Sequence, residues 1–288
     1  VPFSPGGGTD LVARTISEGM SRELGQSVVV ENRPGAGTTI GTDFVVKSPA
    51  DGYTLLLATF AQAVNPSLIK NLPYNASRDL IPVAMVGNSP NVLVVPSQSP
   101  FQSVADVITY AQKFPGKLTY ASQGNGTSAH LAGELFISLT KVDMVHIPYK
   151  GASQAITDVL GGQVQMTFAT ASAAANLVRG GKLKALAVTT KERSASWPNT
   201  PTMIEAGVKD YGMESWYGVC APVGTPREIV MKLNAAVSAA TKTRFFTSKL
   251  EEEGLMARAA SPESFGQYIK QEELRWEKII QAAKIRLD

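Results

Sequence analysis

The sequence opens on VPFSPGGGTD, residues 1–10, and this stretch decides how the fold is interpreted. The apolar end of a strand at Val1–Phe3 runs directly into three glycines, and Thr9 or Asp10 is suited to cap a helix. The spacing predicts that this helix ends at Gly25 and carries on one face Leu11, Val12, Ile16, Met20 and Leu24. Strand, glycine loop and helix in this order begin an α/β pattern.

Strand and helix signals alternate over most of the chain, which predicts α/β architecture with mainly parallel sheets. Helices are expected between the strands, and one of them is capped by Ser103. Two late helices begin at Thr225-Pro226 and Ser261-Pro262, with no strand following, so they must pack on sheets built earlier. The expected strands are residues 27–30, 53–58, 81–86, 91–95, 118–121, 144–147, 164–168 and 186–189.

Two proline-rich segments with linker composition indicate where the chain passes between lobes. They are Pro96–Pro100 and Ala221–Pro226. We therefore expect one lobe from residues 1–96 and 222–288 and a second lobe from residues 97–221. Two crossovers between two α/β lobes make a hinge, and a small ligand then binds in the cleft between them.

Composition excludes several classes of function. The 288 residues contain 27 Lys+Arg and 24 Asp+Glu, so the net charge of +3 gives no basic field for nucleic acid. No apolar run approaches the roughly 18 residues of a membrane span, and the 44% hydrophobic content excludes disorder. The single cysteine, Cys220, excludes an intramolecular disulfide and a cysteine-based zinc cluster. No metal or cofactor motif is found, so neither is expected.

Three segments after predicted strands place glycine beside polar groups. At residues 6–8, exposed backbone N–H groups and the positive end of the following helix suit a carboxylate or phosphate. In SQGNGTS, residues 122–128, the hydroxyls of Thr127 and Ser128 could hold an anion instead of capping a helix. In IPYKGAS, residues 147–153, an aromatic and a cation follow a strand. An ordinary strand-to-helix turn or N-cap is the alternative interpretation of the first two.

The two histidines allow little catalysis. His130 lies in the first turn of its helix, where a neutral imidazole could touch a ligand, whereas His146 is interpreted as a hydrogen-bonded core residue. Ser128 and His130 cannot form a dyad, because residues two apart on a helix do not face each other. The sequence places no Asp or Glu to orient either histidine.

Five segments in the same order resemble the Bug-type receptors, the extracytoplasmic solute-binding proteins of tripartite tricarboxylate transporters. They are PFSPGGGTD (2–10), ENRPGAG (31–37), DGYTL (51–55), YKG (149–151) and GGQV (161–164). The resemblance implies a two-lobed periplasmic-binding-protein type II fold, a small carboxylate ligand and membrane permease subunits as partners. It also implies a periplasmic protein, expected to be a monomer, with a signal peptide and about one strand ahead of Val1.

The resemblance further implies which residues contact the ligand. One wall of the cleft would use Phe3, Ser4, Gly6, Gly7, Thr59 and Ala61. The opposite wall would use Gly126, Thr127, Ser128, Tyr149, Gly151, Ala169 and Thr170, with His130 and Lys150 as further candidates. Many members carry Asp where this chain has Ala169, and an acidic partner is expected for an amine, so the ligand is expected to lack one.

The predicted function is a non-enzymatic receptor that captures a di- or tricarboxylate or an aromatic carboxylate by hinge closure. Three alternatives stay open at this point: an amino-acid receptor of the same family, a sensor subunit for a signalling partner, and an enzyme acting on a carboxylate. The enzyme would need a base, for which the sequence offers only His130 or an unplaced acid.

Overall fold

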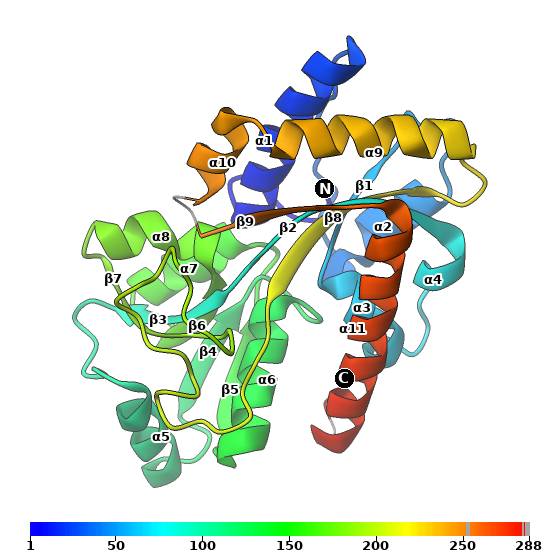
Figure 1. Cartoon of the computed structure of the whole chain (residues 1–288). Helices are drawn as coiled ribbons and strands as arrows, with labels where there is room; N and C mark the ends of the chain where they lie inside the picture. The colour runs from blue at the N-terminus through cyan, green and yellow to red at the C-terminus, as the bar shows by residue number, and fades with distance from the viewer. Residues whose placement is uncertain (252–253, 284, 286–288) are drawn as a thin grey trace. The chain divides into compact units, whose positions relative to one another are not determined.

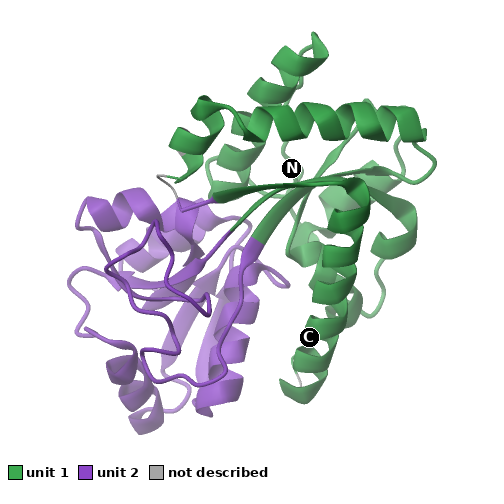
Figure 2. Cartoon of the chain, viewed as in Figure 1, with its two compact units in different colours: residues 1–88, 216–251, 256–288 green, residues 89–215, 252–255 purple. Residues whose placement is uncertain are grey.

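The computed structural model describes residues 1–251, 254–283 and 285, which fold into two compact α/β units (Figures 1 and 2). Unit 1 comprises Val1–Asn88, Trp216–Glu251 and Met256–Asp288, and unit 2 comprises Ser89–Ser215 and Glu252–Leu255. The predicted α/β class is confirmed. In the part of the chain described, none of the helices combines the length and the apolar character needed to cross a membrane.

Unit 1 is built on a four-stranded sheet in the order β1-β8-β2-β9. Its strands are β1 (Leu56–Thr59), β2 (Leu80–Ser89), β8 (Ser215–Pro222) and β9 (Met256–Ala260). Its helices are α1 (Gly8–Leu24), the 3-10 helix η1 (Ala36–Thr38), α2 (Thr39–Val46), α3 (Ala61–Leu68), α4 (Ala76–Asp79), α9 (Arg227–Thr241), α10 (Arg244–Glu251) and α11 (Pro262–Ala283). Helix α1 approaches α9 closely because Gly19 faces Ala240 and leaves no room for a side chain.

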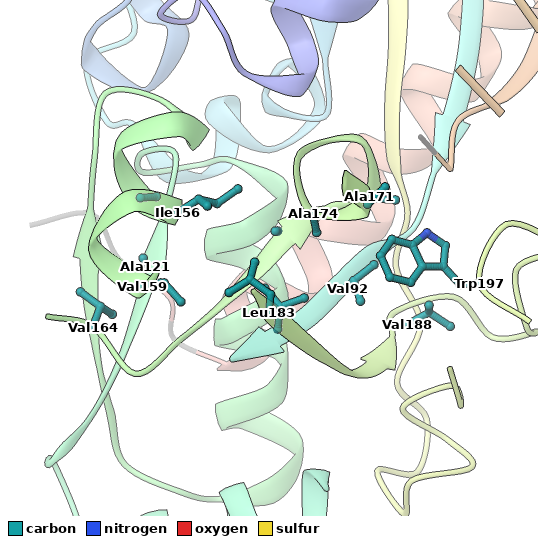
Figure 3. Close-up of a cluster of buried hydrophobic side chains, with 14 residues drawn as sticks. Val92, Ala121, Ile156, Val159, Val164, Ala171, Ala174, Leu183, Val188 and Trp197 are labelled. Atoms are coloured by element: carbon teal, nitrogen blue, oxygen red, sulfur yellow. The ribbon is translucent and has the colours of Figure 1, made fainter. Parts of the chain in front are cut away.

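Unit 2 is built on a five-stranded sheet in the order β5-β4-β6-β3-β7. Its strands are β3 (Asn91–Pro96), β4 (Leu118–Ser122), β5 (Met144–Pro148), β6 (Met166–Thr170) and β7 (Leu183–Val188). Its helices are α5 (Val104–Lys113), α6 (Ser128–Thr140), α7 (Ala152–Leu160) and α8 (Ala171–Arg179). An apolar cluster shown in Figure 3 includes Val92, Val159, Leu183 and Trp197.

The sheets are mixed, which corrects the expectation of mainly parallel sheets. In unit 2, β4 runs parallel to β5 and β6, but β3 runs antiparallel to β6 and β7. In unit 1, β1 pairs antiparallel with β8, and β2 with β9. Strands β3 and β8 carry the chain just after it has changed units. No helix of the same unit turns the chain back before them, so the βαβ rule does not set their direction.

One predicted strand is not formed. Residues 27–30 belong to neither sheet, and Val29 is 85% exposed. Just after them, the amino group of Val1 donates to Glu31 O (2.8 Å) and the carbonyl of Val1 accepts from Arg33 N–H (2.8 Å).

Two strands lay outside the prediction. Strand β8 passes through Trp216 and Tyr217, which the sequence analysis did not assign to a strand. Strand β9 has the sequence MARAA and lies between the late helices, where no strand was expected. It pairs with β2, so tertiary pairing outweighs its weak strand propensity.

Candidate ligand-binding site

The glycine loop of unit 1 is organised by Asp10. Its Oδ2 accepts from Gly6 N–H (3.0 Å) and Arg14 Nε (2.9 Å), and its Oδ1 accepts from Asn32 Nδ2 (2.9 Å). Burial raises the pKa of Asp10, but these hydrogen bonds outweigh it and hold the pKa below its usual value. Asn32 also donates to Phe3 O (3.0 Å), which ties both ends of the loop together. Gly6 has φ +82°, which glycine adopts without strain.

The predicted residues of unit 1 lie before two helices. Phe3, Ser4, Gly6 and Gly7 precede α1, Thr59 ends β1 and Ala61 begins α3. Helix α1 starts after Gly7 without a side-chain cap. The hydroxyl of Thr59 is buried and has no hydrogen-bond partner among the described residues. Such a group calls for a partner outside the chain, such as water or a ligand.

A second loop of unit 1, residues 35–38, has a strained backbone. Gly35, Ala36, Gly37 and Thr38 have φ of +128°, +47°, +59° and +80°. Such angles at Ala36 and Thr38 cost on the order of 1–3 kcal/mol each and cluster at functional sites. The buried Asn65 holds the loop, since its Nδ2 donates to Gly37 O (2.8 Å) and Thr38 Oγ1 (3.2 Å). The glycine-rich PGAG sequence was the available signal.

The loop of unit 2 between β4 and α6 folds on its own hydroxyls. Thr127 Oγ1 donates to Gly124 O (2.6 Å) and makes no side-chain cap for α6. Ser122 Oγ also donates to Gly124 O (3.0 Å) and accepts from Gly124 N–H (3.1 Å). Gly124 and Gly126 have φ of +129° and +73°, conformations suited to glycine. The first-turn N–H groups of α6 are therefore left without a side-chain cap in the described chain.

Ser128 is held by Asn91, a residue that sequence reasoning missed. Asn91 Nδ2 donates to Ser128 Oγ (3.2 Å) and to Phe168 O (2.7 Å). Thr170 lies opposite Asn91 in the β3–β6 register. Asn91 Oδ1 and Ser89 Oγ are buried without a hydrogen-bond partner in the described ranges. These polar groups gather at the start of β3, which the sequence analysis read as loop up to Pro90.

Tyr149 joins the two loops of unit 2, but not through its hydroxyl. Its N–H donates to Ser122 O (3.0 Å), and its carbonyl lies 3.1 Å from where a Cβ of Gly124 would be. Its hydroxyl donates to Asp158 Oδ2 (2.6 Å). Partial burial and this carboxylate raise the pKa of Tyr149 to about 12. The hydroxyl is thus used within unit 2, on a residue of the last turns of α7, while Gly151 precedes the uncapped start of the same helix.

The remaining predicted residues have different surroundings. Ala169 is buried in the apolar cluster of unit 2 opposite Val92. Thr170 precedes α8 and accepts from Ser172 Oγ (3.4 Å). Lys150 is exposed. His130 is buried, and its Nδ1 accepts from Gly126 N–H (3.2 Å).

A cavity of about 560 Å³ in unit 1 lies apart from the predicted residues. Its mainly apolar wall includes Ile16, Met20, Val30, Leu57 and Leu233. None of the predicted ligand-binding residues lines it. A carboxylate needs converging donors, so we do not assign the ligand to this cavity.

Both units thus present glycine-rich or uncapped helix starts, as expected of a receptor for a small anion. The model of the tripartite tricarboxylate transporter family receptor matches residues 12–285, so the chain belongs to this family of solute-binding receptors. The predicted family is confirmed, and it is a family of receptors rather than enzymes.

Several relatives resemble the chain along most of its length. BugT of Bordetella pertussis is 38% identical over 289 residues, which span 100% of this chain and 89% of BugT. The structure of R. palustris Rpa4515 with adipate has a TM-score of 0.96 and 38% identity, covering 100% of this chain and 97% of that one. MatC of Rhodopseudomonas palustris with bound malate has a TM-score of 0.93 and 32% identity, covering 97% of each chain.

Proposed function

We propose that this receptor binds a small carboxylate without an amine and delivers it to permease subunits of a tripartite tricarboxylate transporter in the periplasm. The observation that carries the proposal is the likeness to two receptors of known ligand, Rpa4515 with adipate and MatC with malate. Both ligands are dicarboxylates without an amine. The residue at position 169 supports the same choice, since the buried Ala169 carries no carboxylate that could pair with an ammonium.

In this proposal the carboxylate is held by neutral donors. The starts of α1, α6 and α7 follow Gly7, Thr127 and Gly151 and lack side-chain caps, as far as the chain is described. Each helix start carries about half a positive charge and several N–H groups. The buried hydroxyl of Thr59 is a further donor. Fixed dipoles act strongly on an anion once water is excluded, so a buried cation is not required.

Hinge closure of the two predicted lobes, residues 1–96 with 222–288 and residues 97–221, belongs to the same proposal, as does a monomeric state. Its support is the position of the predicted contact residues, which lie in both units. X-ray scattering with and without ligand measures closure as a decrease in radius of gyration. An unchanged radius on saturation would contradict closure without affecting the proposed ligand class.

The ligand class is tested by thermal shift on protein that has been unfolded, stripped of ligand and refolded. A ligand at 100 times its Kd adds about 2.7 kcal/mol, which raises the Tm of a chain of this size by roughly 5–10 °C. Adipate, malate, citrate and benzoate are compared with aspartate and glutamate at one pH. Stabilisation by amine-free carboxylates supports the proposal. Stabilisation by the amino acids alone would overturn the proposal that the ligand lacks an amine. If none of the compounds raises the Tm, the proposal that the ligand is a carboxylate is overturned.

A further inference from the structure

The chain has two histidines, and both lie against the loop of residues 122–128 in unit 2. His130 comes from α6 and His146 from β5, and their rings stack with centroids 4.2 Å apart and planes 24° apart. His130 is only 3% exposed. A buried imidazole in contact with a half-buried one needs a reason, because apolar side chains would pack there without a desolvation cost.

Each histidine supports one glycine of the loop. His130 Nδ1 accepts directly from Gly126 N–H (3.2 Å). His146 Nε2 lies 2.7 Å from Ser122 Oγ, and that hydroxyl both donates to and accepts from Gly124. Gly124 and Gly126 are the two residues whose positive φ shapes the loop.

These bonds define the protonation of both rings. Because Nδ1 of His130 accepts a hydrogen bond, its ring proton is on Nε2. Ser122 has one proton and gives it to Gly124 O, so His146 donates to Ser122 from Nε2–H. Burial lowers the pKa of His130 to about 3, with a further contribution from His146, and burial lowers the pKa of His146 to about 4. Both rings are therefore neutral at neutral pH, and the hydrogen bond accepted by His130 Nδ1 itself requires a neutral ring.

Three further titratable side chains lie around the two histidines. Glu134 on α6 has Oε1 at 3.8 Å from His130 Nε2, on the side away from Gly126. Tyr120 on β4 stacks on His146 with centroids 4.9 Å apart and donates to Glu134 (2.6 Å). Tyr211 adds a buried phenol near Tyr120. Burial raises the pKa of Glu134, so on acidification this carboxyl takes up a proton before the ring of His130 does.

We propose that His130, supported by the stacked His146, is a positioning residue for the ligand loop. Its Nδ1 accepts a hydrogen bond from Gly126 N–H and so fixes the backbone of the loop that precedes α6. The ligand binds at this loop and at the start of α6. The inference rests on the proposed function only in placing the carboxylate at this loop. In this proposal His130 acts on the loop backbone and is not itself a ligand contact, in place of the candidate contact role predicted from the sequence.

The test compares three substitutions of His130. In His130→Asn the side-chain oxygen can take the place of Nδ1, in His130→Gln it falls near Nε2, and His130→Leu has no acceptor. Affinities for adipate and malate are measured by calorimetry. We expect His130→Asn to stay within about threefold of wild type and the other two to lose on the order of tenfold, as for one hydrogen bond. Equal affinity in His130→Asn and His130→Gln would overturn the proposal.

Tyr211→Phe is the matched control for a merely structural effect. It removes the bond from Tyr211 to Ala132 O (2.7 Å) on the same helix without touching the loop. We expect a lower Tm and unchanged affinity. If its affinity falls as far as that of His130→Leu, loss of α6 stability explains both and the positioning role is wrong.

A measurement without ligand separates this inference from the proposed function. The amide resonance of Gly126 should exchange slowly in wild type and His130→Asn, and faster in His130→Gln. That pattern supports the positioning role even if neither dicarboxylate binds, which would count against the ligand class alone. Fast exchange of Gly126 in wild type would overturn the inference even if both dicarboxylates bind.

Discussion

Helices α5 and α6 of unit 2 both follow hydroxyl residues, yet their first turns are built in opposite ways. At α5, Ser103 Oγ accepts from Asp106 N–H (3.2 Å), and Asp106 Oδ2 accepts from Ser103 N–H (2.9 Å) and Gln102 N–H (2.8 Å). At α6, the Thr127 hydroxyl turns back to Gly124, and Ser128 Oγ accepts from Asn91. The start of α5 is capped by side chains next to it in sequence, whereas the start of α6 has no side-chain cap among the described residues.

The difference shows that a hydroxyl before a helix does not by itself predict a cap. Ser103 caps because Asp106, three residues on, completes the reciprocal pair. Thr127 does not accept from a first-turn N–H of α6, and its hydroxyl instead donates to Gly124 O within the same loop. Unit 1 repeats the contrast between α4, capped by Asn75, and α1, which follows Gly7.

Acid should affect the α6 loop much more than the α5 cap. His130 and His146 have pKa values of about 3 and 4 in the fold, against 6.5 for a free histidine. Below pH 6.5 the unfolded chain therefore binds protons that the fold does not, and stability falls with pH. We expect these two groups to remove on the order of 3–6 kcal/mol between pH 6.5 and pH 4. Urea unfolding across this range measures the slope.

The control for acid is His130→Asn, which removes one titrating ring. Its stability should depend less steeply on pH than that of wild type. Parallel curves for the two proteins would show that His130 does not titrate as inferred.

Removing the support of Ser128 should weaken the open helix start. Asn91→Leu leaves Ser128 Oγ and Phe168 O buried without their donor, which costs about 2–3 kcal/mol. Dicarboxylate affinity should fall as well, as measured by calorimetry. Asn234→Leu in unit 1 is the matched control, because Asn234 also donates to two backbone carbonyls, Val83 O and Ala260 O. It should lower stability and leave affinity unchanged.

A side chain at Gly124 should strain the loop. Gly124→Ala places a Cβ at φ +129° and 3.1 Å from Tyr149 O, with an expected cost of about 1–2 kcal/mol and weaker ligand binding. Gly162→Ala is the control: its φ is +74°, but nothing lies within 4 Å of the added carbon. The Tm should fall in both variants, whereas the dicarboxylate affinity should fall only in Gly124→Ala. An affinity loss in Gly162→Ala would show that strain anywhere in unit 2 suffices.

The two hydroxyls compared above should separate stability from binding. Ser103→Ala should cost about 1 kcal/mol and leave dicarboxylate affinity unchanged. Thr127→Val removes the bond to Gly124 O and should lower affinity, with a stability loss of about 0.5–1.5 kcal/mol. Denaturant unfolding and calorimetry on both variants decide the matter. Equal affinities would mean that the Thr127 hydroxyl is only structural.

Features governed by neighbours in sequence were predictable. Helix α1 ends at Gly25, which has φ +67°, and α5 begins after the Ser103 cap, as the spacing indicates. Strand formation was less predictable, because it depends on a partner. Residues 27–30 have strand composition without a full partner, whereas β9 has little strand propensity but pairs with β2.

The sequence by itself determined the α/β class, the end of α1 at Gly25, the start of α5 after Ser103 and the positions of glycine before α1 and α6, because capping, periodicity and positive φ act over a few residues. Only the tertiary structure decided which distant residues form hydrogen bonds to those loops. Asn91 reaches Ser128 across 37 positions and Tyr149 N–H reaches Ser122 O from another strand. Which distant side chains and backbone groups hold a loop in place depends on contacts made by folding, which local spacing does not encode.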